Sequence, residues 1–204
     1  MQGDTVVLEP LDVSRHGDDL FRASAGADET WHYLPYGPFK DRAEFMSWLA
    51  GRAALDDPLT FTIVDRSTGK ARGLASLMSI VPEHGVIEIG HIWLSPGLQR
   101  TRHATEAIFV MARHSFDELR NRRLEWKCDA ANEPSRRAAE RFGFTFEGVF
   151  RQHRVIKGRN RDTAWYSITD SEWPSRRAAF EAWLEPDNFD NGGTQKRALA
   201  SFRE

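Results

Sequence analysis

The chain has 204 residues, of which 40% are hydrophobic and 28% charged, and its net charge is −2. This composition is typical of a globular domain and excludes an intrinsically disordered chain. The apolar runs are far shorter than the roughly 20 residues that a membrane-spanning helix needs, and the N-terminus lacks a signal-peptide pattern. We therefore expect a cytoplasmic protein without a membrane partner, built as one domain over residues 1–185 with a loosely attached tail over 186–204.

Charge is distributed unevenly along the chain. Residues 1–94 carry six more acidic than basic side chains, whereas residues 95–161 carry seven more basic than acidic ones. A basic middle segment favours a polyanionic ligand and an acidic N-terminal half favours a cationic one, although ordinary solvated surface charge explains both equally well. The single cysteine, Cys128, allows no internal disulfide and no cysteine-based metal site, and we expect no metal.

Six secondary-structure elements are expected in the first half of the chain. They are a strand at 6–11, helices at 14–23 and 41–55, and strands at 59–65, 73–81 and 86–94. Asp41 can cap the second helix, and turn signals between the last three strands indicate an antiparallel meander. The loop 31–39 holds Trp31, Tyr33 and Tyr36. A loop with this many aromatic residues is expected to form a lid or to line a pocket. We therefore take these three residues as candidate substrate contacts.

The second half is expected to alternate helices with strands. Its elements are a helix at 103–119, a strand at 124–128, a helix at 133–142, a hairpin of strands 144–156 and 163–169, and a helix at 173–184. The helix between strands 86–94 and 124–128 is a crossover, which places both strands in one mixed sheet with helices on both faces. The fold class is therefore α/β or α+β, with a twisted, mostly antiparallel mixed sheet of about six to seven strands.

The turn before the helix at 103–119 is a candidate anion site. It joins a strand to a helix N-terminus, where backbone N–H groups without helical partners and the helix dipole attract phosphate. Arg100, Arg102 and His103 add cationic donors to this turn. A solvated basic turn explains these residues on their own equally well, because most strand-to-helix turns bind no ligand.

The segment Gln99-Arg100-Thr101-Arg102-His103-Ala104 resembles the pyrophosphate loop of the GNAT acetyltransferase superfamily, whose pattern is Gln/Arg-x-x-Gly-x-Gly/Ala. Arg102 stands where glycine is usual, and we consider the hypothesis that its side chain contacts phosphate directly. The resemblance implies acetyl-CoA (coenzyme A) as co-substrate and no metal. It also implies that the cofactor contacts Ile92, Trp93, Leu94, Gln99, Arg100, Thr101, Arg102, His103, Ala104, Thr105 and Asn132.

A second segment resembles one subgroup of this superfamily. Asn132-Glu133-Pro134-Ser135, followed by Gly143-Phe144 and Glu147-Gly148, is similar to the ribosomal-protein N-acetyltransferases. In many members of the superfamily a tyrosine seven residues after the asparagine protonates the departing thiolate, whereas Ala139 stands there in this chain. The resemblance therefore suggests Ser135 as the acid, although a serine at this position can equally cap the helix.

Glu88 and His91 are the candidate bases. The acceptor amine must lose a proton before it attacks a thioester, so a base or a water relay is needed. Glu88 is a carboxylate in an apolar strand and lies eleven residues before Gln99, as the catalytic glutamate does in the histone-acetylating branch of the superfamily. Alternation over residues 86–94 places His91 on the opposite face of the strand, where it is the competing base and a candidate substrate contact.

The resemblance implies that the amine attacks the thioester directly in a ternary complex. The expected acceptor is a small molecule or a peptide with a primary amine, and the acyl group is acetyl or a larger one such as succinyl. A non-catalytic acyl-CoA sensor on the same fold is the alternative, because Arg102 and Ala139 depart from the family pattern. Nucleic acid is not expected as a partner, since basic and aromatic residues do not interleave on one face. Assembly as a homodimer is left open.

Overall fold

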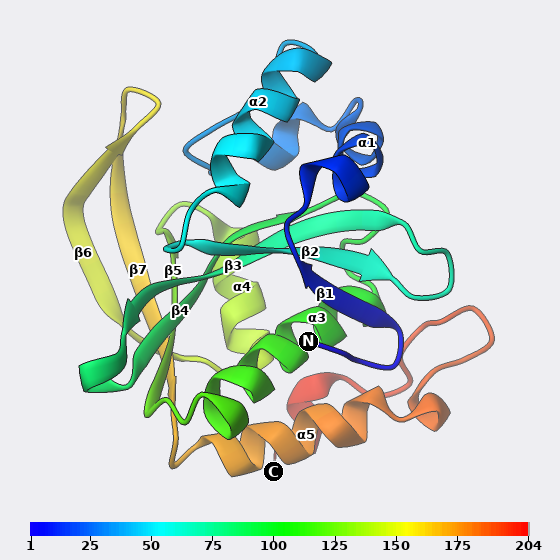
Figure 1. Ribbon diagram of the computed structural model, residues 1–204. Helices are drawn as coiled ribbons and strands as arrows, with labels where there is room; N and C mark the ends of the chain where they lie inside the picture. Colours follow the sequence, from blue (N-terminus) through cyan, green and yellow to red (C-terminus); the bar gives the residue numbers. More distant parts are fainter. Residues whose placement is uncertain (204) are drawn as a thin grey trace. The chain divides into compact units, whose positions relative to one another are not determined.

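The computed structural model describes residues 1–203, which fold into five α-helices and seven β-strands (Figure 1). In chain order they are β1 (Val6–Pro10), α1 (Val13–Ser24), α2 (Arg42–Ala53), β2 (Leu59–Asp65), β3 (Ala71–Val81), β4 (Val86–Leu94), α3 (Arg102–Arg113), β5 (Arg123–Asp129), α4 (Glu133–Phe142), β6 (Thr145–Ile156), β7 (Arg159–Thr169) and α5 (Trp173–Leu184). Over the described residues, no helix has the length and apolar character that crossing a membrane requires.

The strands form a seven-stranded sheet in the order β1-β2-β3-β4-β5-β7-β6. β2 pairs antiparallel with both β1 and β3, and β7 pairs antiparallel with both β5 and β6. The crossover through α3 separates these two antiparallel groups along the chain. The predicted α+β class, with a mixed and mostly antiparallel sheet of six to seven strands, is confirmed.

By contacts between residues, the chain divides into two compact units. The first consists of residues 1–80 and 88–110, and the second of residues 81–87 and 111–204. The three divisions fall inside β3, β4 and α3 rather than in linkers. A single domain over residues 1–185 stays a prediction.

Side-chain caps begin both α1 and α2. Oδ1 of Asp12 accepts the backbone N–H groups of Ser14 and Arg15, at 2.8 and 3.1 Å, ahead of α1. Hydrogen bonds, with the one from the Ser14 hydroxyl the strongest, lower the pKa of the Asp12 carboxyl. Asp41 accepts the N–H of Glu44 at 2.9 Å ahead of α2, which confirms the predicted cap.

The first unit has an apolar core that fixes the aromatic loop 31–39. The buried core residues are Leu11, Leu20, Trp31, Phe45, Leu49, Ala71, Leu74 and Trp93. Tyr36, Phe39 and Trp48 pack against this core and against one another. A fully buried side chain of this size contributes about 1.5–3 kcal/mol to stability. The loop is therefore anchored by packing against side chains of α1, α2, β3 and β4.

α3 ends at Arg113, whereas the apolar periodicity predicts a helix to residue 119. A π-helical turn, His114–Glu118, follows it. In this turn Ser115 donates its hydroxyl hydrogen to the carbonyl of Met111 at 2.8 Å. A serine that bonds back to the preceding turn competes with the regular helical ladder. The apolar spacing does not reveal this change, because a π-turn also keeps its apolar side chains inward.

In the second unit the predicted hairpin is confirmed, with a tighter turn than expected. Ile156 pairs with Arg159, so the turn consists of Lys157 and Gly158 alone. Both turn residues have positive φ, 50° and 73°. A two-residue turn that matches the twist of the strands requires this conformation. β7 consequently begins at Arg159 and not at residue 163.

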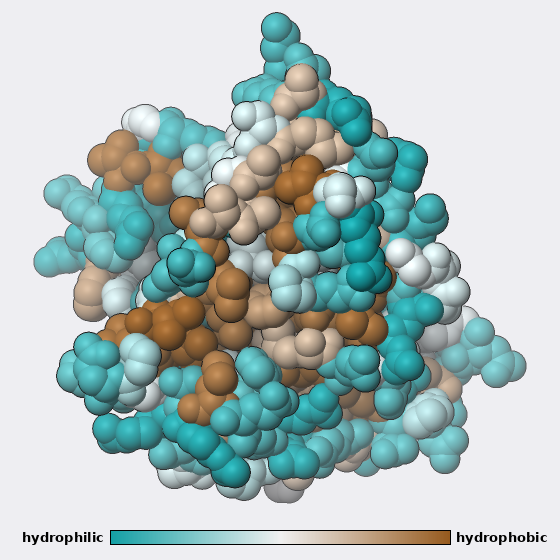
Figure 2. Space-filling model, in the orientation of Figure 1, coloured by the Kyte–Doolittle hydropathy of each residue, from teal (hydrophilic) through white to brown (hydrophobic). Residues whose placement is uncertain are grey.

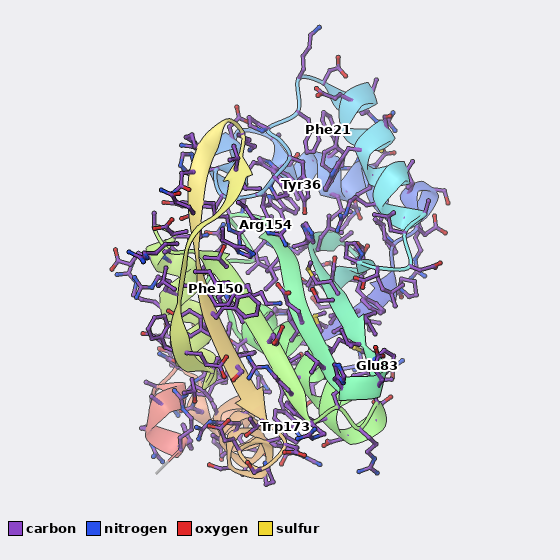
Figure 3. All side chains as sticks on the ribbon, turned by 90° about the vertical axis from the view of Figure 1, so that its left-hand side faces the viewer. Phe21, Tyr36, Glu83, Phe150, Arg154 and Trp173 are labelled. Atoms are coloured by element: carbon purple, nitrogen blue, oxygen red, sulfur yellow. The ribbon has the colours of Figure 1, made fainter. Side chains whose placement is uncertain are left out.

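β6 is the outermost strand of the second unit and carries exposed apolar side chains. Phe150 is 53% exposed and Val155 is 73% exposed, and Figure 3 shows Phe150 and Arg154 on the hairpin. Register shifts at Phe146/Gly148 and at Phe150/Arg154 interrupt the pairing of β6 with β7. Such irregularities protect an edge strand from pairing with other chains. Figure 2 likewise shows hydrophobic side chains that reach the surface between hydrophilic ones.

The segment after α5, which is expected to be a loosely attached tail, makes side-chain hydrogen bonds. The side-chain amide of Asn188, which is buried, donates to the carbonyls of Trp183 and Arg197, at 3.0 and 3.3 Å. Leu199 is 1% exposed, and Arg203 donates to two carbonyls at the end of α4. These contacts are hydrogen bonds from side chains of an irregular segment to backbone carbonyls. Such contacts leave no helical or strand period in the sequence.

Candidate functional site

β4 carries both candidate bases, and its regular alternation is interrupted at His91. This residue has a φ of 50°, a left-handed conformation that is uncommon outside glycine. A left-handed residue inside a strand marks a bulge, which re-aims the side chains around it. His91 stacks on Tyr36 and Trp93 stacks on Trp31, so both side chains contact the aromatic loop. The strict alternation predicted for residues 86–94 therefore does not run through the strand.

Glu88 is buried, as expected for a carboxylate in an apolar strand, with 5% of its surface exposed. Its Oε2 accepts a hydrogen bond from the hydroxyl of Ser79 at 3.0 Å. Gly90 leaves room for the other oxygen, because a Cβ at Gly90 would lie 3.2 Å from Oε1 of Glu88. A carboxylate fixed in this way is suited to take up a proton. Its role as the base stays a prediction.

His91 forms a pair with Tyr36, which is labelled in Figure 3. The hydroxyl of Tyr36 lies 3.0 Å from Nδ1 of His91, and the ring planes differ by 19°. Burial raises the pKa of Tyr36 to about 12, although the nearby charge of Arg52 opposes the shift. Tyr36 therefore keeps its proton at neutral pH. A protonated Tyr36 donates to Nδ1 when that nitrogen has no hydrogen and accepts from it when it has one, so the pair is a hydrogen bond in either neutral tautomer of His91.

The three aromatic residues predicted to contact substrate differ in burial. Trp31 is 1% exposed and stacks on Trp93, with ring centroids 4.8 Å apart and planes 10° apart. It is a core residue with no surface for a substrate, which corrects the prediction for Trp31. Tyr33 and Tyr36 are half-buried, and they remain candidate contacts. Trp31 fills the core because the loop turns inward there, which the aromatic content alone does not reveal.

The turn that joins β4 to α3 holds its shape through its own hydrogen bonds. The N–H groups of Leu98 and Gln99 both donate to the carbonyl of Ser95, at 2.9 and 3.1 Å. The side-chain amide of Gln99 donates to the carbonyl of Leu94 at 3.0 Å. The structure thereby brings together the end of β4 and the start of the basic loop, the two segments predicted to contact the cofactor.

Thr101 caps α3. Its Oγ1 accepts the N–H of Ala104 at 3.2 Å, and its carbonyl accepts the N–H of Thr105 at 3.3 Å. The first N–H groups of a helix have no partner within the helix, and with the helix dipole they attract an anionic group. Arg102 and His103 lie in the first helical turn, half-buried. This arrangement of donors and charge fits the pyrophosphate of coenzyme A.

Arg102 occupies the position at which the family pattern has glycine, yet the backbone there does not require glycine. α3 begins at Arg102, and the left-handed residue of the loop is Arg100, with a φ of 60°. A helical φ is open to every residue that has a side chain. The arginine therefore adds a side chain at the start of α3 without straining the backbone.

Sequence reasoning missed Arg72, whose side chain lies against this turn. The guanidinium of Arg72 lies 2.6 Å from where a Cβ of Gly97 would be, so it adds a cation behind the loop. Arg72 pairs with Asp65 at 3.5 Å. Burial opposes ionisation of Asp65, but hydrogen bonds from Ser67 and the charge of His103 together lower its pKa. No local signal could have found Arg72, because a strand distant in sequence brings it to the turn.

Asn132 and Ser135 belong to the second unit. Oδ1 of Asn132 accepts the N–H of Ser135 at 3.2 Å, so Asn132 and not Ser135 caps α4. Oγ of Ser135 accepts a hydrogen bond from Nε1 of Trp126 at 3.1 Å. Burial raises the pKa of the Cys128 thiol by more than a hydrogen bond from Ser135 lowers it. Cys128 is thus a poor nucleophile, and the role of Ser135 as the acid stays a prediction.

Residues 5–145 match the acetyltransferase (GNAT) domain family. The chain therefore belongs to this family, as the basic loop and the crossover through α3 indicate. Members of the family transfer an acetyl group from acetyl-CoA. The predicted class of enzyme, an acetyl-CoA-dependent acetyltransferase, is confirmed at the level of the family.

Solved structures extend this similarity over almost the whole chain. A GCN5-related N-acetyltransferase from Brucella melitensis is 52% identical, with a TM-score of 0.97, and the alignment covers 99% of this chain and 92% of that one. A probable acetyltransferase of the GNAT family from Chromobacterium violaceum is 47% identical, with a TM-score of 0.80, and the coverage is 85% and 87%. The alignment with the Brucella protein includes the segment after α5, which the family match does not reach.

One curated relative points to the predicted subgroup. YdaF from Bacillus subtilis, whose name describes a ribosomal N-acetyltransferase, is 28% identical over 109 residues. The aligned region makes up 53% of this chain and 59% of YdaF. This similarity supports the predicted likeness to ribosomal-protein N-acetyltransferases.

Proposed function

We propose that the protein transfers an acetyl group from acetyl-CoA to a primary amine of a polypeptide. One observation carries this proposal: β4 presents the buried Glu88 and then leads, within eleven residues, into the basic loop that starts at Gln99. Acyl transfer from a thioester that carries phosphate requires a base and a site that binds the phosphate. This short segment has a candidate base at one end and an anion-binding turn at the other.

Binding of acetyl-CoA falls to the loop and to the end of β4. The N-terminus of α3, with Arg100, Arg102 and His103, would hold the pyrophosphate. The co-substrate supplies the reactive thioester. Backbone N–H groups of residues 92–94 would polarise the thioester carbonyl, because they lie at the end of the strand that leads to the loop.

The reaction needs three proton transfers. Glu88 takes a proton from the ammonium form of the acceptor, because only the neutral amine has a lone pair. The amine nitrogen then bonds to the carbonyl carbon of the acetyl group, the carbon–sulfur bond breaks, and the nitrogen loses a second proton to solvent as the amide forms. The departing sulfur takes up a proton, for which Ser135 is the candidate donor. His91 is the alternative base.

The acceptor that we propose is an amine on a protein, such as an N-terminal amino group. YdaF is named for ribosomal acetylation, which supports a protein acceptor. Residues 1–94 carry six more acidic than basic side chains, so their field favours a positively charged acceptor. Tyr33 and Tyr36 add half-buried aromatic surface in the same part of the chain.

Two observations favour other functions. The position of the usual tyrosine acid holds Ala139, which is 0% exposed and lacks a proton to donate, and this favours a non-catalytic acyl-CoA sensor. The excess of seven basic side chains over residues 95–161 favours a larger, anionic acyl group such as succinyl.

Release of free thiol from acetyl-CoA, measured with a panel of amines, tests the proposal. The panel contains peptides with a free N-terminal serine, the same peptides with a blocked N-terminus, spermidine and lysine. Turnover that requires the free N-terminus is expected. Binding of acetyl-CoA without turnover of any amine would establish the sensor instead. A higher kcat/KM with succinyl-CoA than with acetyl-CoA would replace the proposed acyl donor.

A further inference from the structure

The carboxylate of Glu88 is held by a hydroxyl that comes from a strained position. Ser79, in β3, has a φ of 51°, a conformation that disfavours residues with a side chain. Its hydroxyl donates to Oε2 of Glu88 at 3.0 Å. Backbone strain of this kind persists only where the surrounding structure over-determines it, and it is concentrated at functional sites.

Asp57 fixes the strained backbone. Its Oδ1 accepts the N–H of Ser79 at 2.9 Å, and its Oδ2 accepts the N–H of Ile80 at 3.1 Å. The pairing of β2 with β3 ends at Leu59 and Leu77, and the same register extended by two residues places Asp57 opposite Ser79. A side-chain carboxylate thus replaces the backbone carbonyls as acceptor at the point where β2 ends.

We propose that Ser79 and Asp57 are positioning residues that orient the Glu88 carboxylate for proton transfer from the acceptor amine. This inference rests on the proposed function of Glu88 as the base. Oε2 is bound by Ser79, and Oε1 lies beside Gly90, where a Cβ would approach to 3.2 Å from Oε1 and to 2.4 Å from Sδ of Met78. The carboxylate is therefore confined on both sides.

A glycine at position 79 separates this role from a purely structural one. Ser79→Gly removes the hydroxyl and also relieves the backbone strain, since glycine adopts positive φ without cost to the fold. If Ser79 is only structural, the melting temperature stays equal or rises and kcat is unchanged. If Ser79 positions Glu88, the melting temperature behaves in the same way but kcat falls about tenfold. KM for acetyl-CoA is expected to stay constant, because the basic loop is not altered.

Two further variants sharpen this comparison. Ser79→Asn tolerates the left-handed backbone and offers an amide donor, so it is expected to restore part of kcat. Arg120→Gly is the matched control. Arg120 is exposed, also has a left-handed backbone with a φ of 59°, and is distant from Glu88 in the sequence. The variant relieves the same kind of strain, and kcat is expected to stay at the wild-type value.

The role of Asp57 is tested by comparing its variant with the Ser79 variant, because Asp57 is proposed to act through Ser79. Asp57→Ala removes the acceptor of two N–H groups, and kcat is expected to fall by about the same tenfold, since the hydroxyl of Ser79 is no longer held in place. The double variant Asp57→Ala/Ser79→Gly is expected to be no slower than the slower single variant. Two independent losses that multiply would overturn the proposed chain from Asp57 through Ser79 to Glu88.

Glu88→Gln distinguishes failure of this inference from failure of the proposed function. An unchanged kcat in Glu88→Gln, with the best amine of the panel, overturns both. A reduced kcat in Glu88→Gln together with an unchanged kcat in Ser79→Gly overturns only the positioning role. The NMR resonance of the Glu88 carboxyl carbon, assigned by its loss in Glu88→Gln, needs no acceptor. It is expected to shift in Ser79→Gly and in Asp57→Ala, and a resonance that stays in place would overturn the inference.

Discussion

Glu106, in α3, accepts both the backbone N–H and the hydroxyl of Thr5 with one carboxylate oxygen. The same carboxylate accepts the N–H groups of Asp4 and Val6, at 2.7 and 3.0 Å. Gly3 fits beside it because a Cβ there would lie 2.6 Å from Cδ of Glu106. The chain before β1 is therefore fastened to the helix that starts at the basic loop.

Glu106→Gln is expected to lower the free energy of unfolding by about 2–3 kcal/mol. The carboxylate is 3% exposed, and a glutamine would turn an N–H group toward donors that need an acceptor. Urea unfolding at constant m-value measures the loss. Glu118→Gln is the control, because Glu118 is exposed and pairs only with His114 among the contacts of the described residues, and a change below about 0.5 kcal/mol is expected. Equal effects in the two variants would contradict the buried-acceptor argument.

Ionisation of Tyr36 is expected to lower the free energy of unfolding at alkaline pH. Burial raises its pKa from 10.0 to about 12, so between these values the unfolded chain loses the phenolic proton while the folded chain keeps it. The free energy of unfolding therefore decreases as pH rises from about 10 to 12, by up to about 3 kcal/mol. The contribution is fully present below pH 10. Urea unfolding across this range measures the slope.

Tyr36→Phe tests this dependence directly. The variant has no phenol to ionise, so its stability is expected to decline less steeply with pH than that of the wild type. At neutral pH it loses the hydrogen bond to His91, at a cost of about 1 kcal/mol. Tyr33→Phe is the matched control from the same loop, because it removes a phenol and leaves the contact of Tyr36 with His91 in place. Parallel curves for the wild type and Tyr36→Phe would refute the prediction.

Arg102→Ala is expected to weaken the binding of coenzyme A about tenfold if the side chain contacts phosphate. A charge-assisted hydrogen bond contributes about 1.5–3 kcal/mol, and the helical backbone at this position leaves the turn intact in the variant. Isothermal titration with coenzyme A measures the effect, and Arg42→Ala, an exposed arginine of α2 that pairs with Asp18, is the control. A tighter complex in Arg102→Gly or Arg102→Ala would show that the arginine obstructs the ligand.

The sequence predicts the regular elements well, for identifiable physical reasons. The cap at Asp41 and the hairpin around Gly158 follow from chemistry that acts within a few residues. The loop at Gln99 is predicted to bind the cofactor by its motif, whereas its basic charge alone leaves a solvated turn equally acceptable. Neither the motif nor the charge pattern separates a structural role from a binding role at a single residue such as Asn132.

Other features cannot be predicted from local sequence patterns, because contacts between distant parts of the chain determine them. The left-handed conformation of Ser79 depends on Asp57, which is far from it in sequence, and it therefore gives no periodic signal. Arg72 reaches the basic loop only because β3 passes beside it. The sequence predicts a substrate contact at Trp31 because aromatic residues in a loop can face either way. Its stacking on Trp93 turns the side chain into the core instead.

Asn132 offers a test in which stability and binding are separated. Asn132→Ala removes the cap of α4 and is expected to lower the free energy of unfolding by about 1 kcal/mol. Asn132→Ser keeps a side-chain acceptor for the N–H of Ser135 and is expected to retain most of the stability. If Asn132 also contacts the cofactor, Asn132→Ser still binds coenzyme A more weakly than the wild type. Wild-type affinity in the serine variant would limit Asn132 to capping.

Removal of residues 186–204 is expected to destabilise the protein, in contrast to removal of a loose tail. Truncation deprives Nε1 of Trp183 of its acceptor, Oε1 of Gln195 at 2.8 Å, and exposes the surface that Leu199 covers. It also removes the donors that Arg203 offers to the end of α4. Exposure of one buried leucine site alone costs about 2 kcal/mol, so the melting temperature is expected to fall by several degrees.

Asn188→Ala is the point variant that checks the same attachment without shortening the chain. The buried amide of Asn188 donates to two carbonyls, and its Oδ1 accepts the N–H of Arg197 at 3.0 Å. Its loss leaves these backbone groups without partners, which costs about 1–3 kcal/mol. Asp190→Ala, at an exposed turn of the same segment, is expected to have a smaller effect. Should the truncated chain and Asn188→Ala both melt at the wild-type temperature, the contacts of this segment contribute nothing to stability, and the expectation of a loose tail would hold after all.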